Sequence, residues 1–168
     1  WPMFDTSGAQ GFAASVGSLL DNCAALGLNT VIVQVRPFGD AVYPSAVYPW
    51  SHLVTGVQGQ DPGYDPLAIF VEQAHARGLA IEAWVNPYRV RLNDTMPPGE
   101  LAADNPALLH EGWALEANGG LYYDPALPEV QDMVVQGVTE IVQNYDGTEF
   151  SSTTTFIQPQ TKCSTRRA

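Results

Sequence analysis

Two short runs of aliphatic residues, each preceded by a helical pattern, constrain the fold of this chain more than any other feature. Residues 30–35 and 79–85 are continuous and largely aliphatic, which is typical of parallel strands covered on both faces. Apolar side chains recur at helical spacing over residues 9–26, 67–77 and 128–145. The order helix, strand, helix, strand, helix predicts an α/β fold.

The side chains of the two predicted strands alternate in the same way. One face of each strand is aliphatic, and the other becomes polar toward the C-terminal end, with Ile32, Gln34 and Arg36 in the first strand and Glu82, Trp84 and Asn86 in the second. A long loop follows each strand. A (β/α)8 barrel builds its active site from such strand ends and loops, so we predict a partial (β/α)8 (TIM) barrel with long βα loops. The alternative is that Gln34 and Arg36 only cap the strand and pair with acidic residues.

The loops after these strands combine aromatic rings with polar side chains, a combination that suits sugar binding. Rings stack on pyranose faces, while polar groups fix the hydroxyls. Tyr88 and Tyr123 are two of the loop aromatics, and Asp40, Glu82 and Asp124 are the best-placed acids. For any single aromatic, packing of a long loop is the simpler explanation, and for Asp124 a turn or capping role is favoured.

Composition and motifs exclude several other classes of function. The formal net charge of −11 at pH 7 argues against nucleic acid and anionic membranes, because phosphates require a basic face. No run approaches the roughly 20 apolar residues of a membrane span. His52, His75 and His110 lack the spacing of metal ligands, and no phosphate-binding loop, dinucleotide fingerprint or nucleophile elbow is present. We therefore expect no cofactor and no metal.

Several motifs stand out together: Gln34-Val35-Arg36-Pro37, Gly63-Tyr64-Asp65-Pro66, Ala83-Trp84-Val85-Asn86-Pro87-Tyr88-Arg89 and Gly119-Gly120-Leu121-Tyr122-Tyr123-Asp124-Pro125. With them the chain resembles the bacterial glycosyl hydrolase-like 10 family over roughly residues 1–146. The resemblance implies a (β/α)8-barrel glycoside hydrolase linked to bacterial cell-wall or other amino-sugar glycans. It also implies a glycan cleft lined by Gln34, Arg36, Trp84, Asn86, Tyr88 and Arg89. The residue types add Asp40, Tyr123 and Asp124 to these substrate-binding candidates.

The resemblance breaks where the family's fourth strand is expected. That strand carries Asp-Gly-(Ile/Val)-x-x-Asp-Asp-Tyr-Phe-Tyr-Pro, the expected source of a catalytic acid, and should follow Asp146 almost at once. Residues 151–158 instead read Ser-Ser-Thr-Thr-Thr-Phe-Ile-Gln. Suitable codons for this run, read from the third base of the Ser151 codon, give Ile-Asp-Asp-Tyr-Phe-Tyr-Pro. The sequence therefore does not identify the catalytic residues.

We hypothesise that the reading frame shifted near codon 147. The chain then divides into residues 1–146, the N-terminal part of a glycoside hydrolase-like barrel, and residues 147–168, an out-of-frame tail. Charge agrees with this division, since 17 of the 18 acidic residues precede position 147 and three of the seven basic residues follow it. The alternative is a genuine tail that has diverged.

On this interpretation the chain holds about two strands and three helices of a larger barrel, with the family's first strand before Trp1. We expect it to be marginally stable and catalytically inactive alone. The leading function is a glycoside hydrolase in incomplete form, with a polysaccharide or oligosaccharide as partner. The alternatives are a non-catalytic carbohydrate-binding module and a plain α/β interaction domain. We expect the full-length protein to be extracytoplasmic or secreted, and the oligomeric state stays open.

Overall fold

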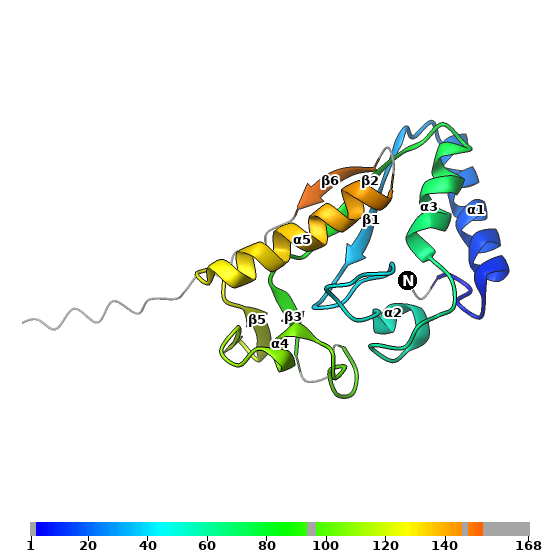
Figure 1. Cartoon of the computed structure of the whole chain (residues 1–168). Helices are drawn as coiled ribbons and strands as arrows, with labels where there is room; N and C mark the ends of the chain where they lie inside the picture. Colours follow the sequence, from blue (N-terminus) through cyan, green and yellow to red (C-terminus); the bar gives the residue numbers. More distant parts are fainter. Residues whose placement is uncertain (1–2, 94–96, 146–147, 153–168) are drawn as a thin grey trace, which may run out of the picture.

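A computed structural model describes residues 3–93, 97–145 and 148–152, and a three-stranded parallel sheet lies at its centre (Figure 1). The strands are β1 (Thr30–Arg36), β2 (Ala80–Val85) and β6 (Thr148–Ser152), in the order β1-β2-β6. A helix precedes each strand along the chain, namely α1 (Ala9–Ala25), α3 (Pro66–His75) and α5 (Pro128–Asn144). The predicted alternation of helices and strands is confirmed.

The sequence predicts two strands, and the third, β6, is a finding of the structure. Its backbone pairs in parallel with β2, with Thr148 beside Ile81 and Ser152 beside Val85. The expectation of a two-stranded piece is therefore wrong, because residues that follow position 147 form a strand in the same sheet. β1 and β6 are the two edges of this described sheet.

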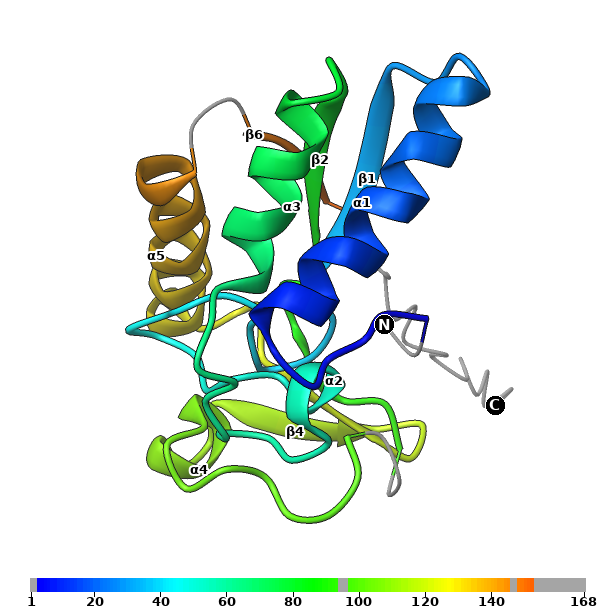
Figure 2. The ribbon, with the colours of Figure 1, turned by 90° about the vertical axis from the view of Figure 1, so that its right-hand side faces the viewer.

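The two faces of the sheet differ as the strand alternation predicts. Val33 and Val35 of β1 and the aliphatic residues of β2 are buried in one core cluster together with residues of α1, α3 and α5. Figure 2 shows α1 and α3 side by side over β1 and β2. The Phe12 ring of α1 and the Phe70 ring of α3 pack on each other with their centroids 5.8 Å apart. On the opposite face Ile32 is 60% exposed. We call this opposite face the inner face, since it faces the interior of a barrel.

The helix ends follow from local signals in the sequence. Asp65 caps α3, because its Oδ1 accepts a hydrogen bond from the Ala68 N–H at 3.0 Å, and Pro66 fills the first helical position. α1 ends where the Leu28 N–H donates to the Cys23 carbonyl at 3.1 Å, with Gly27 at a φ of 77°. This φ lies in the left-handed region, a backbone conformation that glycine adopts without a steric penalty.

A second, antiparallel sheet lies beyond the C-terminal ends of β1 and β2. It contains β3 (Arg89–Arg91), β4 (Ala114–Ala117) and β5 (Gly120–Tyr123), in the order β3-β5-β4. β4 and β5 form a β-hairpin with the tightest type of turn. Gly120 pairs with Ala117, so only Asn118 and Gly119 form the turn, with φ angles of 52° and 78°. Two short helices lie in the long loops: α2 (His52–Thr55) between β1 and α3, and α4 (Pro106–Leu109) between β3 and β4.

α5 packs directly on the loop that follows β1. The Tyr43 hydroxyl donates to the Gly137 carbonyl at 3.2 Å, and the Ser45 hydroxyl donates to Glu140 at 2.6 Å. A Cβ atom built on Gly137 would lie 2.5 Å from Tyr48 Cε2 and 2.8 Å from Arg36 Nη1. Glycine at this position therefore allows the helix to approach the ring of Tyr48.

We expect Gly137→Ala to lower the free energy of unfolding by about 1–2 kcal/mol, because overpacking against the buried Tyr48 ring outweighs the gain in helix propensity. Gly17→Ala in α1 is the matched control. Its Cβ would meet only the ends of the Arg77 and Gln73 side chains, at 3.1 Å each. Urea denaturation of both variants measures the difference, and a Gly137→Ala protein at least as stable as Gly17→Ala would contradict this account.

Candidate functional site

The inner face of β1 and β2 presents polar and aromatic side chains in register. Gln34 lies beside Trp84 in the parallel pairing, and Ile32 lies beside Glu82. Gln34, Glu82 and Trp84 are all half-buried. The strands thus place an amide, a carboxylate and an indole in adjacent positions of one sheet face. The predicted orientation of these side chains is confirmed.

Arg36 does not continue this row. The β1–β2 register shifts between Gln34 and Arg36, so that Arg36 pairs with Val85 and the strict alternation is lost at a bulge. Its side chain is fully buried, with the guanidinium carbon 3.6 Å from the centre of the Tyr48 ring. The expectation that Arg36 points the same way as Ile32 and Gln34 is therefore wrong. The side chain turns toward Gly137 of α5 and makes its cation–π contact with Tyr48, which lies in the loop after β1.

The residues that follow β2 join the ends of the two strands. Asn86 is buried, donates from Nδ2 to the Pro37 carbonyl at 3.0 Å, and through its backbone N–H bonds the Arg36 carbonyl at 2.8 Å. Tyr88 and Arg89 are half-buried, and the Tyr88 carbonyl accepts a hydrogen bond from the Tyr123 N–H at 2.8 Å. Asn86 thus fixes the spacing of the loops, while Tyr88 and Arg89 keep part of their surface accessible.

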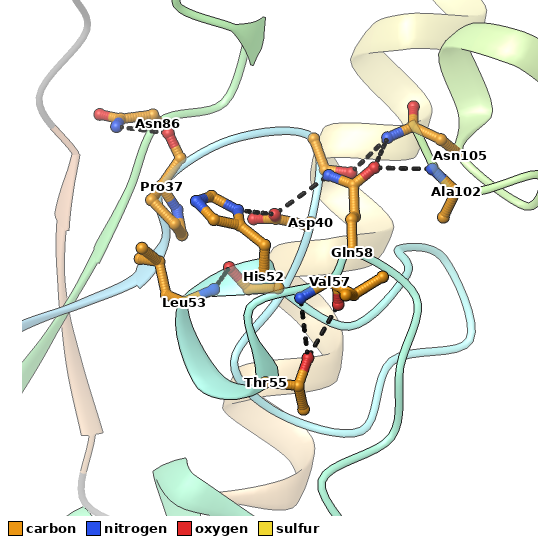
Figure 3. A network of polar contacts seen from close by, with 12 residues as sticks. Pro37, Asp40, His52, Leu53, Thr55, Val57, Gln58, Asn86, Ala102 and Asn105 are labelled. Atoms are coloured by element: carbon orange, nitrogen blue, oxygen red, sulfur yellow. Dashed lines mark hydrogen bonds and ion pairs between the residues drawn. The ribbon is translucent and has the colours of Figure 1, made fainter. Parts of the chain in front are cut away.

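A buried polar network lies beneath these loops (Figure 3). Asp40 is fully buried, and its Oδ2 accepts a hydrogen bond from Gln58 Nε2 at 3.1 Å and lies 3.4 Å from His52 Nδ1. Gln58 Oε1 in turn accepts hydrogen bonds from the Ala102 N–H at 3.0 Å and from Asn105 Nδ2 at 3.2 Å. The role that the structure shows for Asp40 is to hold α2 against the loop after β1.

Asn105 is the centre of this network. Its Nδ2 also donates to the Gly39 carbonyl at 2.9 Å, and its Oδ1 accepts from the Tyr123 hydroxyl at 3.2 Å and from the Ala107 N–H at 3.0 Å. Burial raises the pKa of the Tyr123 hydroxyl, so that this group stays a protonated donor. Tyr123 is therefore a buried brace between β5 and the loop after β1.

Sequence reasoning missed Gln58 and Asn105. For Asn105 a signal exists, since asparagine before proline at a helix start is a common cap, and its Oδ1 does cap α4. Gln58 carries no local signal, because its partners lie 18, 44 and 47 residues away. Asp124 is half-buried, and its Oδ1 accepts from the Ala126 N–H at 2.9 Å, which is the turn role favoured for it.

The described residues contain no cluster of three or more His, Cys, Asp or Glu side chains arranged to hold a metal ion. Among the same residues, no helix has the length and apolar character needed to cross a membrane. The expected site residues thus divide into two groups. Gln34, Trp84, Tyr88, Arg89 and Asp124 keep accessible surface, whereas Arg36, Asp40, Asn86 and Tyr123 are buried and support the loops.

Known proteins resemble this chain in sequence. The family model described as glycosyl hydrolase-like 10 matches residues 13–158. The glycosyl hydrolase YngK of Bacillus subtilis is 49% identical over 128 residues, which are 76% of this chain and 25% of YngK. The glycosyl hydrolase DigH of Escherichia coli K12 is 42% identical over an alignment of 142 residues, and the match covers 78% of this chain and 32% of DigH. The chain thus spans about a quarter to a third of these curated relatives.

One solved structure supports the architecture. The maltogenic α-amylase AmyB of Thermotoga neapolitana superposes with a TM-score of 0.55 and 17% sequence identity, over 88% of this chain and 36% of the amylase. At that identity the likeness concerns the fold alone. The partial (β/α)8 barrel predicted from the strand pattern is confirmed.

Proposed function

The chain belongs to the glycosyl hydrolase-like 10 family, and we propose that it is part of a glycoside hydrolase acting on a bacterial cell-wall-type or related polysaccharide. The observation that carries the proposal is the family match together with the inner face, where Gln34 and Trp84 lie side by side. An indole that stacks on a sugar ring beside an amide that bonds its hydroxyls is a pairing suited to glycans. Such a substrate lies outside the cytoplasm, so we expect the full-length protein there.

Hydrolysis of a glycosidic bond requires two carboxyl groups that flank it, one of which acts as the general acid. We expect this acid at the end of the family's fourth strand, and the parallel pairing of β6 with β2 supports assigning β6 to that strand. In the alternative reading frame the aspartates of the family motif would follow β6 directly, at its C-terminal end. Catalytic residues of (β/α)8 barrels come from such strand ends. The chain as it stands lacks these aspartates, so we propose that it is incomplete and inactive.

Binding of an oligosaccharide tests whether the inner face is a glycan cleft. We expect the N-acetylglucosamine tetramer to bind this chain and Trp84→Ala to weaken the affinity about tenfold, since a lost ring contact is worth about 1 kcal/mol or more. Isothermal titration calorimetry measures both constants. Trp113→Ala is the matched control, because the Trp113 ring already stacks on His110, with the two ring centroids 3.9 Å apart. Equal affinities of the Trp84→Ala variant and the unchanged chain would contradict the proposed cleft.

A further inference from the structure

The outer side of the chain carries a groove that the proposed cleft does not use. It has a volume of about 690 Å³ and lies between the C-terminal half of α5, the tip of the loop after β1 and the segment before α3. The side chains that matter in its lining are Ser45, Trp50, Asp61, Tyr64, Glu140 and Asn144. None of them belongs to the inner face. We call this feature the outer groove.

The walls of the outer groove are fixed before any ligand binds. Glu140 accepts hydrogen bonds from the Ser45 hydroxyl at 2.6 Å and from the Ala46 N–H at 2.7 Å, which joins the loop tip to α5. The Trp50 carbonyl accepts from the Gly59 N–H at 2.8 Å, and Asp61 Oδ1 accepts from the Gly63 N–H at 2.7 Å. A preformed site loses less conformational entropy on binding.

The two aromatic residues of the outer groove are held by different contacts. The Tyr64 ring packs on Phe12 with centroids 5.4 Å apart, and its hydroxyl donates to the Thr6 carbonyl at 3.5 Å. Trp50 is half-buried, and its backbone is held by a bridge to Ala41. Tyr64 is therefore a fixed wall, and Trp50 is the half-buried aromatic residue of the lining that we assign to stacking on a sugar.

Charge narrows the class of ligand. The described lining carries two carboxylates, Asp61 and Glu140, and neither Lys nor Arg. Anionic ligands are therefore repelled, whereas the hydroxyls of an uncharged sugar can donate to the carboxylates and to the Asn144 amide oxygen. A volume of about 690 Å³ lies within the usual range of small-ligand sites.

From these features we infer that the outer groove is a second carbohydrate-binding site, which takes uncharged sugar units of a polysaccharide away from the inner face. The inference rests on the proposed function for its ligand class. A polymer held at the outer groove raises the effective concentration of its own chain near the inner face. The site therefore retains a polysaccharide without taking part in bond cleavage.

The indole N–H signals of Trp50 and Trp84 report the two sites separately in ¹H–¹⁵N spectra of the intact chain. Trp50→Phe and Trp84→Phe assign the two signals. We expect the N-acetylglucosamine tetramer or maltotetraose, at millimolar concentration, to shift the Trp50 signal along a saturable curve. The curve should persist in the Trp84→Ala variant. Asn144→Ala, at an exposed position of α5, should weaken the sugar affinity reported by the Trp50 signal several-fold without unfolding the chain.

The outcomes separate this inference from the proposed function. A shift of Trp84 with an unmoved Trp50 signal overturns the second site and leaves the inner-face cleft standing. A shift of Trp50 alone supports the outer groove and overturns glycan binding at the inner face. A tetragalacturonate that shifts Trp50 as strongly as the neutral sugars overturns the assigned ligand class. If neither indole moves, both proposals are overturned.

Discussion

The purified 168-residue chain is expected to release no sugar from a polysaccharide above the uncatalysed rate. Glycoside hydrolysis needs a general acid, and we propose that the motif expected to supply it is absent after position 147. A protein that is read in the alternative frame beyond that codon, and that also includes the first strand expected before Trp1, should be active. Enzymes commonly accelerate such reactions at least about 10⁶-fold, so the contrast between the two proteins is large. A reducing-end assay on bacterial cell-wall glycan measures it.

The nucleotide sequence around codon 147, together with the intact protein mass, is the control for this expectation. A shifted frame predicts codons for Asp-Asp-Tyr-Phe-Tyr-Pro and then the rest of a barrel downstream. An uninterrupted frame through codons 147–168, with a matching protein mass, would exclude the shift. Turnover by the 168-residue chain itself would instead show that the catalytic acids are already present.

Asn105→Ala is expected to lower the free energy of unfolding by about 3 kcal/mol, which is more than a hundredfold in the folded-to-unfolded ratio. The amide of Asn105 takes part in four hydrogen bonds, and alanine leaves the Gly39 carbonyl and the Tyr123 hydroxyl buried without this partner. Each such group costs about 1–3 kcal/mol. Urea denaturation followed by circular dichroism measures the loss.

Asn144→Ala is the matched control for Asn105→Ala, since Asn144 is exposed near the end of α5. Its effect should stay within about 0.5 kcal/mol, as is usual for surface substitutions. If the two alanine variants unfold at the same urea concentration, the network around Asn105 does not hold the loops as described. An Asn105→Ala variant that fails to fold at all would agree with the expected direction. Asn105→Ser, which should lower the free energy of unfolding by less, would then be measured in its place.

The sequence predicts those features of the fold whose determining residues lie close together along the chain. Asp65 and Pro66 mark the start of α3, and Gly27 marks the end of α1, because capping depends on neighbours along the chain. The bulge that turns Arg36 toward α5 has no such signal. It depends on packing against Tyr48 and Gly137, which lie far away in the sequence.

The candidate site shows the same division. The inner-face positions of Gln34 and Trp84 follow from the two-residue period of a strand, so they are predictable. The buried position of Asp40 is not predictable in this way, because Gln58 joins it through Asn105 to Gly39 and Tyr123. Residue type alone therefore identifies a polar side chain near the loops but not whether it faces a ligand or a neighbouring loop.

Within the described residues β1 is an edge strand of the parallel sheet, which bears on the solubility of this protein. An edge strand offers unpaired amide and carbonyl groups to other chains, and Ile32, 60% exposed on the inner face beside that edge, adds an apolar contact. Molecules that carry a net charge of −11 at pH 7 repel one another and keep such edges apart. Acidification toward the carboxyl pKa values near 4 removes that repulsion. Solubility should therefore fall steeply as the pH approaches about 4.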